Sequence, residues 1–106
     1  MVRQTRTLRP VHPGEVLREE FLNPLGLNPH KLALALRVSA PSVYEIVREE
    51  RAISPEMALR LARYFGTTPE FWLNLQTRYD LELARDKGLR RVEREVHPLT
   101  EPLVSN

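Results

Sequence analysis

The positions of the prolines constrain this chain more than any other feature of its sequence. Nine of the 106 residues are proline. Three of them directly follow a residue that can cap a helix, in the pairs Asn28-Pro29, Ser54-Pro55 and Thr68-Pro69, and Pro41 lies two residues after Ser39. A proline in the first turn of a helix costs little, because an amide there has no intrahelical acceptor. The pattern therefore predicts four helices that begin with a polar cap and a proline.

Apolar residues recur at helical spacing between these breaks and predict five helices in all. Their expected starts are Pro13, Asn28, Ser39, Ser54 and Thr68. We expect Asn23-Pro24 to end the first helix after Leu22, and Gly66 to end the fourth in a left-handed conformation. The fifth helix is expected to reach about Ala84. Beyond Gly88, the segment "RRVEREV" alternates weakly and is compatible with either a short strand or a tail.

A chain of this length is enough for one domain and too short for two. Because strand patterns are otherwise absent, the predicted fold class is all-α. Within a single domain of residues 1–106, we expect a basic N-terminal arm at residues 1–11, a helix-turn-helix domain at residues 12–84 and a C-terminal extension at residues 85–106.

Positive charge gathers near both ends, although the net charge is only +2. Arg3, Arg6 and Arg9 form the N-terminal arm, and a second basic cluster runs from Arg85 to Arg94. Either cluster could approach the phosphates of a nucleic acid. Alternatively, both could be solvated, mobile ends.

Several classes of protein are excluded by what the sequence lacks. No apolar run approaches the roughly 18 residues of a membrane span, and the first ten residues contain no apolar segment typical of a secretory signal. The absence of cysteine excludes disulfides and fits a reducing compartment. We therefore expect a cytoplasmic protein that is not associated with a membrane.

The second and third expected helices are joined by a turn of three residues, as in a helix-turn-helix. The small Ala33 lies where the two helices would cross, and Val43 and Ile46 are placed to lock the second of them inward. Arg37 occupies the turn position that favours glycine, because the backbone there has a positive φ. The alternative is an ordinary helical hairpin within a bundle.

A helix-turn-helix predicts which side chains would meet DNA, because its second helix enters the major groove by its N-terminal end. The expected groove-facing residues are Ser39, Ala40, Pro41, Ser42, Tyr44 and Glu45. The expected phosphate contacts are Asn28, His30, Lys31, Arg37, Arg48 and Arg51. Ala40 and Pro41 offer no hydrogen-bonding group, and Glu49 and Glu50 offset the nearby arginines. We therefore expect weak or A·T-biased base recognition, carried largely by phosphate contacts.

The fifth helix has two apolar sides, more than a chain of this size can bury by itself. One side is formed by Phe71, Trp72, Leu75, Tyr79 and Leu83. Leu73, Leu81 and Ala84 form the other, which we interpret as a homodimer interface; these leucines could instead be scattered and exposed. Asn74 and Gln76 could hydrogen-bond across an interface or cap a helix, and Tyr79-Asp80 could clasp the N-terminal segment.

The sequence gives no indication of catalysis, a metal or a cofactor. The histidines His12, His30 and His97 are far apart and lack metal-ligand spacing. His12, which precedes Pro13-Gly14, is expected to cap or pack. Adjacent glutamates point to different sides of a helix and cannot act as an acid–base pair. We expect a protein that is not an enzyme.

Three segments together resemble a known family over Thr7 to about Ala84: "HPGEVLREEFLNPLGL", "KLALALRVSAPSVYEIV" and "ISPEMALRLARYFGTTPEFWLNLQTRYDLELA". They are similar to the HigA (VapI-like) antitoxins, which are helix-turn-helix proteins of the five-helix lambda-repressor-like class. The family commonly has a polar or basic pair where this chain has Ala40 and Pro41. It also has an Asn-Gly-Lys-like loop where this chain has residues 48–50.

The resemblance implies an antitoxin that binds and neutralises a HigB/RelE-like toxin, a ribosome-dependent mRNA endonuclease. It also implies a dimer that binds a palindromic operator and represses its own operon. The two basic segments near the chain ends are the candidate toxin contacts. Two alternatives remain open: a stand-alone helix-turn-helix regulator without a toxin, and a protein-interaction module that has lost DNA binding.

Overall fold

The computed structural model of the chain describes residues 9–100, and every regular element among them is helical. The first helical run is continuous and comprises α1 (Pro13–Val16), the π-helical η2 (Leu17–Leu22) and α2 (Asn23–Leu25). The other helices are α3 (Pro29–Leu36), α4 (Ala40–Val47), α5 (Pro55–Phe65) and α6 (Pro69–Glu95). Counting the first run as one helix, the fold is the predicted five-helix, all-α arrangement. Arg3 and Arg6 of the basic arm lie outside the described residues.

The four predicted cap-and-proline starts are confirmed. The side chain of Asn28 accepts a hydrogen bond from the Lys31 amide at 2.8 Å. The hydroxyls of Ser39, Ser54 and Thr68 each accept one from the amide three residues on. These bonds satisfy amide donors that have no intrahelical acceptor, which is why a short chain with many prolines still forms five helices.

The prediction that Asn23-Pro24 ends the first helix is wrong. The helical run continues to Leu25 and stops at Gly26, whose φ is 67°. A proline inside an α-helix clashes with the carbonyl four residues earlier. Here the preceding six residues form wider π-helical turns, and the Asn23 amide donates to the carbonyl of Arg18, five residues back. Such a local widening relieves the clash and lets the helix pass the proline.

The prediction that the last helix ends near Ala84 is also wrong. Helix α6 continues to Glu95 and includes most of the "RRVEREV" segment, so neither a strand nor a tail begins after Gly88. The residues beyond Ala84 are mostly good helix formers, and one glycine is tolerated inside a helix. The boundary expected after residue 84 therefore lies inside α6.

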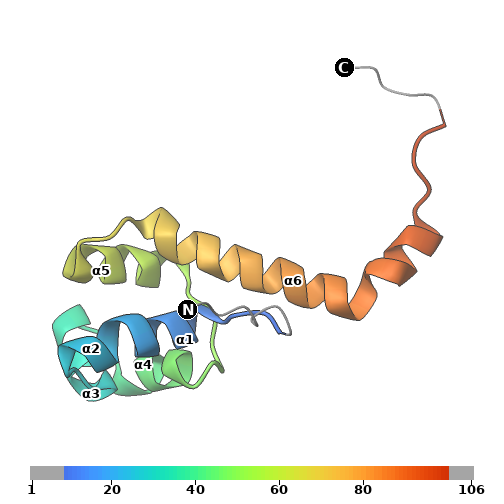
Figure 1. Cartoon of the computed structure of the whole chain (residues 1–106). Coiled ribbons are helices and arrows are strands. Elements are labelled where there is room, and N and C mark those ends of the chain that lie inside the picture. The colour runs from blue at the N-terminus through green and yellow to red at the C-terminus, as the bar shows by residue number, and fades with distance from the viewer. Residues whose placement is uncertain (1–8, 101–106) are drawn as a thin grey trace.

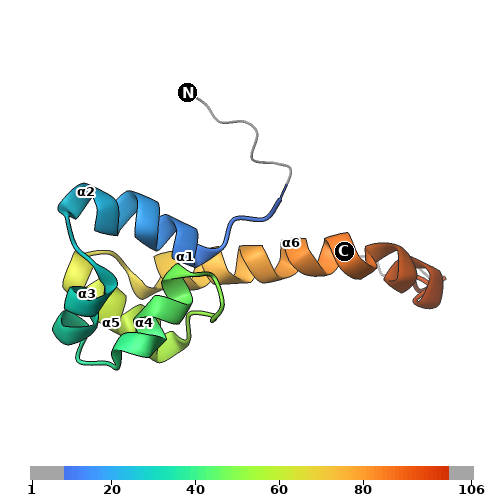
Figure 2. The same ribbon diagram turned by 90° about the horizontal axis from the view of Figure 1, so that it is seen from below.

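Helices α3 and α4 lie together on one side of the body, and α5 with the first half of α6 lies on the other (Figure 1). Seen from below, the second half of α6 extends beyond every other element (Figure 2). The core between the two sides is built from Leu17, Leu32, Ile46, Leu61 and Trp72, all at most 1% exposed. Ala33 and Val43 are buried as the helix-turn-helix spacing predicts.

Candidate nucleic-acid interface

The turn between α3 and α4 has the backbone geometry that the sequence predicts. Arg37 has a φ of 62°, which costs a residue other than glycine about 1 kcal/mol. The Val38 amide donates to the carbonyl of Ala33 at 3.1 Å and closes the end of α3. Arg60 of α5 adds a hydrogen bond of 2.9 Å from Nη1 to the carbonyl of Leu36. These contacts hold the turn in place without glycine.

The N-terminal edge of α4 stands at the surface. Ser39, Pro41 and Tyr44 are exposed, and Ser42 and Glu45 are half-buried. We refer to these five residues as the α4 edge. Ala40 was expected to lie among them, but it is half-buried and packs against the core. A methyl group at this position therefore serves the packing of the monomer.

The cationic side chains beside the α4 edge are already paired with carboxylates. Both Nε and Nη2 of Arg51 lie 2.7 Å from Oε1 of Glu45. Nε of Arg48 lies 3.4 Å from Oε1 of Glu50, and its guanidinium lies 5.9 Å from the centre of the Tyr44 ring. The charge cancellation expected from "REER" is thus present. One of the pairs, however, joins Arg51 to Glu45, which lies outside that segment.

The predicted phosphate-contacting residues come from the two ends of α3 and from the segment that follows α4. His30 and Lys31 are exposed in the first turn of α3, where Asn28 caps the helix. Arg37 lies at the other end of α3, where it lines a groove together with Glu56, Leu59, Arg63 and Tyr64 of α5. Arg37 thus lies two residues before Ser39 of the α4 edge and beside α5.

The three residues of the expected dimer interface also differ in their surroundings. Leu73 is half-buried and packs against the core of its own chain. Leu81 is 48% exposed, and Ala84 is exposed. The second apolar side of α6 therefore begins after the helix leaves the body.

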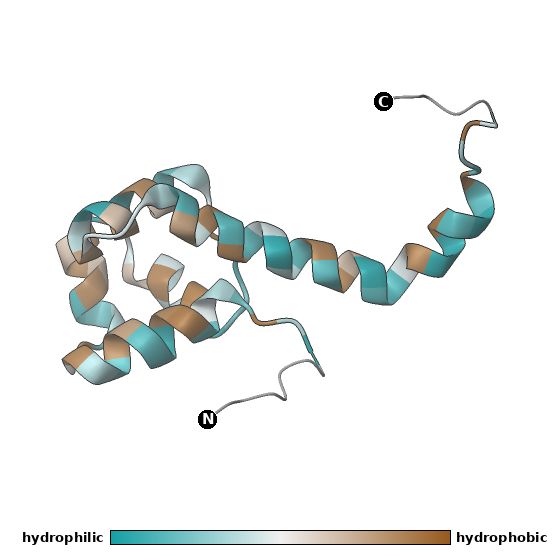
Figure 3. Ribbon diagram, turned by 45° about the horizontal axis from the view of Figure 1, so that its top comes forward, coloured by the Kyte–Doolittle hydropathy of each residue, from teal (hydrophilic) through white to brown (hydrophobic). Residues whose placement is uncertain are grey.

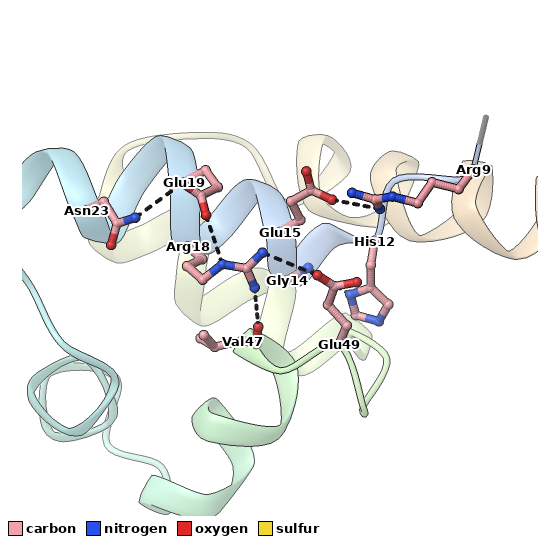
Figure 4. Close-up of polar contacts among 9 residues, drawn as sticks. All are labelled: Arg9, His12, Gly14, Glu15, Arg18, Glu19, Asn23, Val47 and Glu49. Carbon is pink, nitrogen blue, oxygen red and sulfur yellow. Dashed lines mark hydrogen bonds and ion pairs between the residues drawn. The ribbon is translucent and has the colours of Figure 1, made fainter. Parts of the chain in front are cut away.

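Residues that the sequence prediction did not assign to the site surround the segment after α4. We call residues 48–54 the post-α4 loop, because they join α4 to α5. Arg18 donates from Nη1 to the carbonyl of Val47 at 2.6 Å and from Nη2 to Oε2 of Glu49 at 3.3 Å (Figure 4). Oε1 of the buried Gln76 accepts from the Ile53 amide at 2.8 Å. Gln76 lies on the apolar side of α6, four residues after Trp72 and three before Tyr79, and a polar residue at such a position is the signal that could have indicated this contact.

His12 is buried next to the same loop and caps α1, as its position before Pro13-Gly14 predicts. Its Nδ1 accepts a hydrogen bond from the Gly14 amide at 2.8 Å, and its ring lies edge-on against Tyr79 at 4.7 Å. Desolvation lowers the pKa of His12, and the negative charges of Glu49 and Asp80 partly oppose that shift. Tyr79 thus contacts the N-terminal segment, the role that the sequence suggests for Tyr79-Asp80.

The described part of the chain contains neither a grouping of metal ligands nor a membrane-spanning helix. Among residues 9–100, no three His, Cys, Asp or Glu side chains are grouped so that they could hold a metal ion. No described helix is both long enough and apolar enough to span a membrane.

Comparison with known proteins identifies the family. A helix-turn-helix family model matches residues 17–72. Virulence-associated protein I of Dichelobacter nodosus is 58% identical over 74 residues, which are 70% of this chain and 68% of that protein. Antitoxin HigA-1 of Vibrio cholerae is 40% identical over 79 residues, 74% of each chain. The chain belongs to the HigA (VapI-like) family of helix-turn-helix antitoxins.

Solved structures of HigA-type proteins agree with this assignment. The structure of the Pseudomonas aeruginosa antitoxin HigA with the higBA promoter is 53% identical in sequence and has a TM-score of 0.84. The match covers 86% of this chain and 99% of that one. The antitoxin GraA in complex with its operator is 44% identical with a TM-score of 0.83, over 94% of this chain and 99% of that chain. The family consists of antitoxins and transcriptional regulators and is not enzymatic.

Proposed function

We propose that this protein is an antitoxin and autorepressor. As a homodimer it binds the operator of its own operon, and it also binds and neutralises a HigB/RelE-like mRNA endonuclease toxin. The observation that supports this most is the exposed α4 edge on a complete helix-turn-helix, in a family with structures that contain operator DNA. A protein that acts on its own operon works where that DNA is, which for a bacterial antitoxin is the cytoplasm.

The α4 edge enters the major groove in this proposal. The Tyr44 hydroxyl can donate to or accept from a base edge, and Glu45 can accept from the amino group of cytosine. The two serines are engaged in the cap of α4: Ser39 Oγ accepts from the Ser42 amide, and Ser42 Oγ donates to the Ser39 carbonyl at 2.7 Å. Ser39 can therefore still donate to a base edge, and Ser42 can still accept from one. Pro41 offers only an apolar contact, such as one with a thymine methyl group. The number of base-reading groups is therefore small.

Phosphate contacts supply most of the affinity in this proposal. Lys31, His30 and the α3 N-terminus that Asn28 caps face one stretch of the backbone, while Arg48 and Arg51 face another. Because Glu45 and Glu50 already pair with the two arginines, phosphates must compete with these carboxylates. We expect binding that weakens steeply as the salt concentration rises.

Dimerisation places two α4 edges on one face of the DNA. Half-sites of helix-turn-helix dimers are about 34 Å apart, one turn of the duplex. Leu81 and Ala84 are exposed on the part of α6 that leaves the body, so they are available to a second copy. Leu73 contributes less than expected, because its own core already covers part of it.

DNA binding is tested with duplex DNA from the region upstream of the gene, in gel shifts and footprints at several salt concentrations. The proposal expects a protected site with two-fold symmetry and a shift that weakens as salt is added. An unshifted probe at low salt would contradict it and would favour a protein-interaction module that has lost DNA binding.

Toxin neutralisation is tested by expressing the neighbouring small open reading frame with and without this chain. The proposal expects growth arrest by the neighbour, rescue by this chain, and a complex of the two proteins in a pull-down. A harmless neighbour would support a stand-alone regulator instead. That alternative has its own support, because an uncharacterised helix-turn-helix regulator of Haemophilus influenzae is 46% identical over 87% of each chain.

A further inference from the structure

Residues from both ends of the fold meet at the post-α4 loop, which carries Arg48 and Arg51. One of them, Arg18, comes from the first helical run, and another, Gln76, comes from α6, 58 residues later in the sequence. They lie in or next to the motifs "HPGE" and "WLNLQ", which direct contact with DNA does not explain. These motifs therefore owe their role to their contacts with the loop.

Arg18 holds the beginning of the loop. The last carbonyls of α4 have no intrahelical donor, and the Arg18 guanidinium supplies one to Val47 at 2.6 Å. The same guanidinium pairs with Glu49 at 3.3 Å. Glu49 has a φ of 65°, a conformation that is unfavourable for a residue with a Cβ atom. A fixed partner for its carboxylate helps to hold this conformation.

Gly14 allows α1 to approach the end of α4 closely. A Cβ atom at this position would overlap the carbonyl group of Ile46, which is backbone and cannot move aside. The glycine of "HPGE" is therefore required for close contact between the two helices. This contact brings Arg18, one turn further along, within reach of Val47.

Gln76 holds the far end of the loop. Its side chain is buried, accepts from the Ile53 amide at 2.8 Å and donates from Nε2 to Asp80 at 2.9 Å. Ile53 is itself buried, so its amide would otherwise have no partner. Between the two held ends, Arg48 and Arg51 remain exposed.

We propose that Arg18 and Gln76 are positioning residues for DNA binding, which fix the two ends of the post-α4 loop so that Arg48 and Arg51 meet the phosphate backbone together. This inference rests on the proposed function. A loop that is already ordered loses less conformational freedom when it binds, so its phosphate contacts contribute more of their energy to affinity. The two motifs thus contribute to DNA binding indirectly. Their residues hold the post-α4 loop in place and do not contact DNA themselves.

The test uses Arg18→Met in the full chain, since methionine keeps an aliphatic stem and Arg18 is only partly buried. Binding to duplex DNA from upstream of the gene is measured by fluorescence anisotropy across a salt series. Each phosphate contact contributes about 0.9 to the slope of log K against log salt. We expect the slope to fall by about 1–2, and affinity at about 0.1 M salt to fall about tenfold.

Arg78→Met is the control. Like Arg18, Arg78 carries one positive charge and pairs with a glutamate, Glu82 at 3.2 Å, but this pair lies within α6 and involves neither the helix-turn-helix nor the post-α4 loop. We expect Arg78→Met to leave the salt slope unchanged. Circular dichroism melts establish that both variants fold.

A background that lacks both loop arginines separates positioning from general stabilisation. In the double variant Arg48→Gln/Arg51→Gln, adding Arg18→Met should lower the salt slope no further. Arg18→Lys keeps one donor for Val47 but no fork for Glu49, so it should give an intermediate slope, and it serves as the second variant should Arg18→Met not fold.

The outcomes distinguish this inference from the proposed function. An unchanged slope in Arg18→Met, an equal loss in Arg78→Met, or a further loss in the triple variant would each overturn the positioning role. The proposed function survives these results if the arginine double variant still binds more weakly than the wild type. If the wild-type protein does not bind the duplex at all, both proposals fail.

Discussion

The two halves of α6 form one continuous helix, but they have very different surroundings. In the first half, Trp72 and Gln76 are buried, and they contact the core and the post-α4 loop. In the second half, from Leu81 to Glu95, no residue is buried, and the apolar Leu81, Leu89 and Val92 are at least 41% exposed. In Figure 3, hydrophobic (brown) bands recur on the helices of the body, whereas the free part of α6 is mostly hydrophilic (teal) with a few brown bands.

This difference shows that helix formation and burial are separate properties. The second half is helical because its residues favour a helix and the first half has already nucleated it. The first half is held in place because its side chains pack against the core and contact the post-α4 loop. Changes in the first half should therefore alter the stability of the whole fold, whereas changes in the second half should have small or local effects.

The largest effect is expected at Trp72. Its side chain is fully buried, stacks near Phe21 with ring centres 5.0 Å apart, and donates from Nε1 to Thr67 at 2.8 Å. We expect Trp72→Ala to lower the free energy of unfolding by about 3–5 kcal/mol, because it leaves a cavity in the core. Urea unfolding followed by circular dichroism measures this change. A loss below about 1 kcal/mol would mean that the first half of α6 is not anchored as described.

A smaller effect is expected from the protonation of His12, which packs against Tyr79 of the first half. Because the pKa of His12 is lowered in the folded protein, the unfolded chain binds more protons at and just below the usual value of about 6.5. The free energy of unfolding should therefore not depend on His12 titration above that pH, and it should decrease as the pH falls below it. Thermal melts between about pH 5 and 8 follow this change.

His12→Asn is the control for this pH dependence. An asparagine can still accept the hydrogen bond from the Gly14 amide, but it does not titrate. Its melting temperature should vary less with pH over the same range. An identical pH dependence in both proteins would assign the effect to other groups.

A modest gain is expected at Gly88, in the free half of α6. A Cβ atom there would meet only the end of the Arg91 side chain, at 3.5 Å, so alanine fits. Gly88→Ala should stabilise the helix locally by up to about 1 kcal/mol. Amide hydrogen exchange should slow in residues 85–95, while the unfolding of the body changes little. Slower exchange throughout the body would show that the two halves are coupled.

The smallest effect on monomer stability is expected at Leu81. A change at an exposed position usually alters the free energy of unfolding by less than about 0.5 kcal/mol. Leu81→Ser should leave urea unfolding of the dilute protein unchanged. If Leu81 belongs to a dimer interface, the same change should shift sedimentation equilibrium toward the monomer. A wild-type dimer that is unaffected by this change would place the interface elsewhere.

Much of the fold could be predicted from local chemistry. The sequence correctly predicts the four helix starts with a cap and a proline, and it correctly predicts the positive φ of Arg37. Each of these features depends only on neighbouring residues. The errors at Pro24 and Ala84 have a different origin. A wider π-helical turn accommodated the proline, and helical propensity alone carried α6 beyond its last core contact.

The candidate site was predictable only in part. Spacing placed Ser39, Pro41 and Tyr44 at the surface, but it could not show that Ala40 packs inward or that Arg51 pairs with Glu45. Those facts depend on side chains that meet across the turn and the loop. The contacts of Arg18 and Gln76 with the post-α4 loop join residues about 30 and 23 positions apart, which no periodic pattern encodes.

The sequence by itself determined where helices begin, which of their faces are apolar, and that two of them form a helix-turn-helix. These properties follow from caps, prolines and periodicity, which act over one or two turns. The tertiary structure alone decided which half of α6 is buried, which arginines are already paired, and how the loop after α4 is held. These depend on backbone carbonyls and buried amides finding partners from distant segments, and only the folded chain brings such groups together.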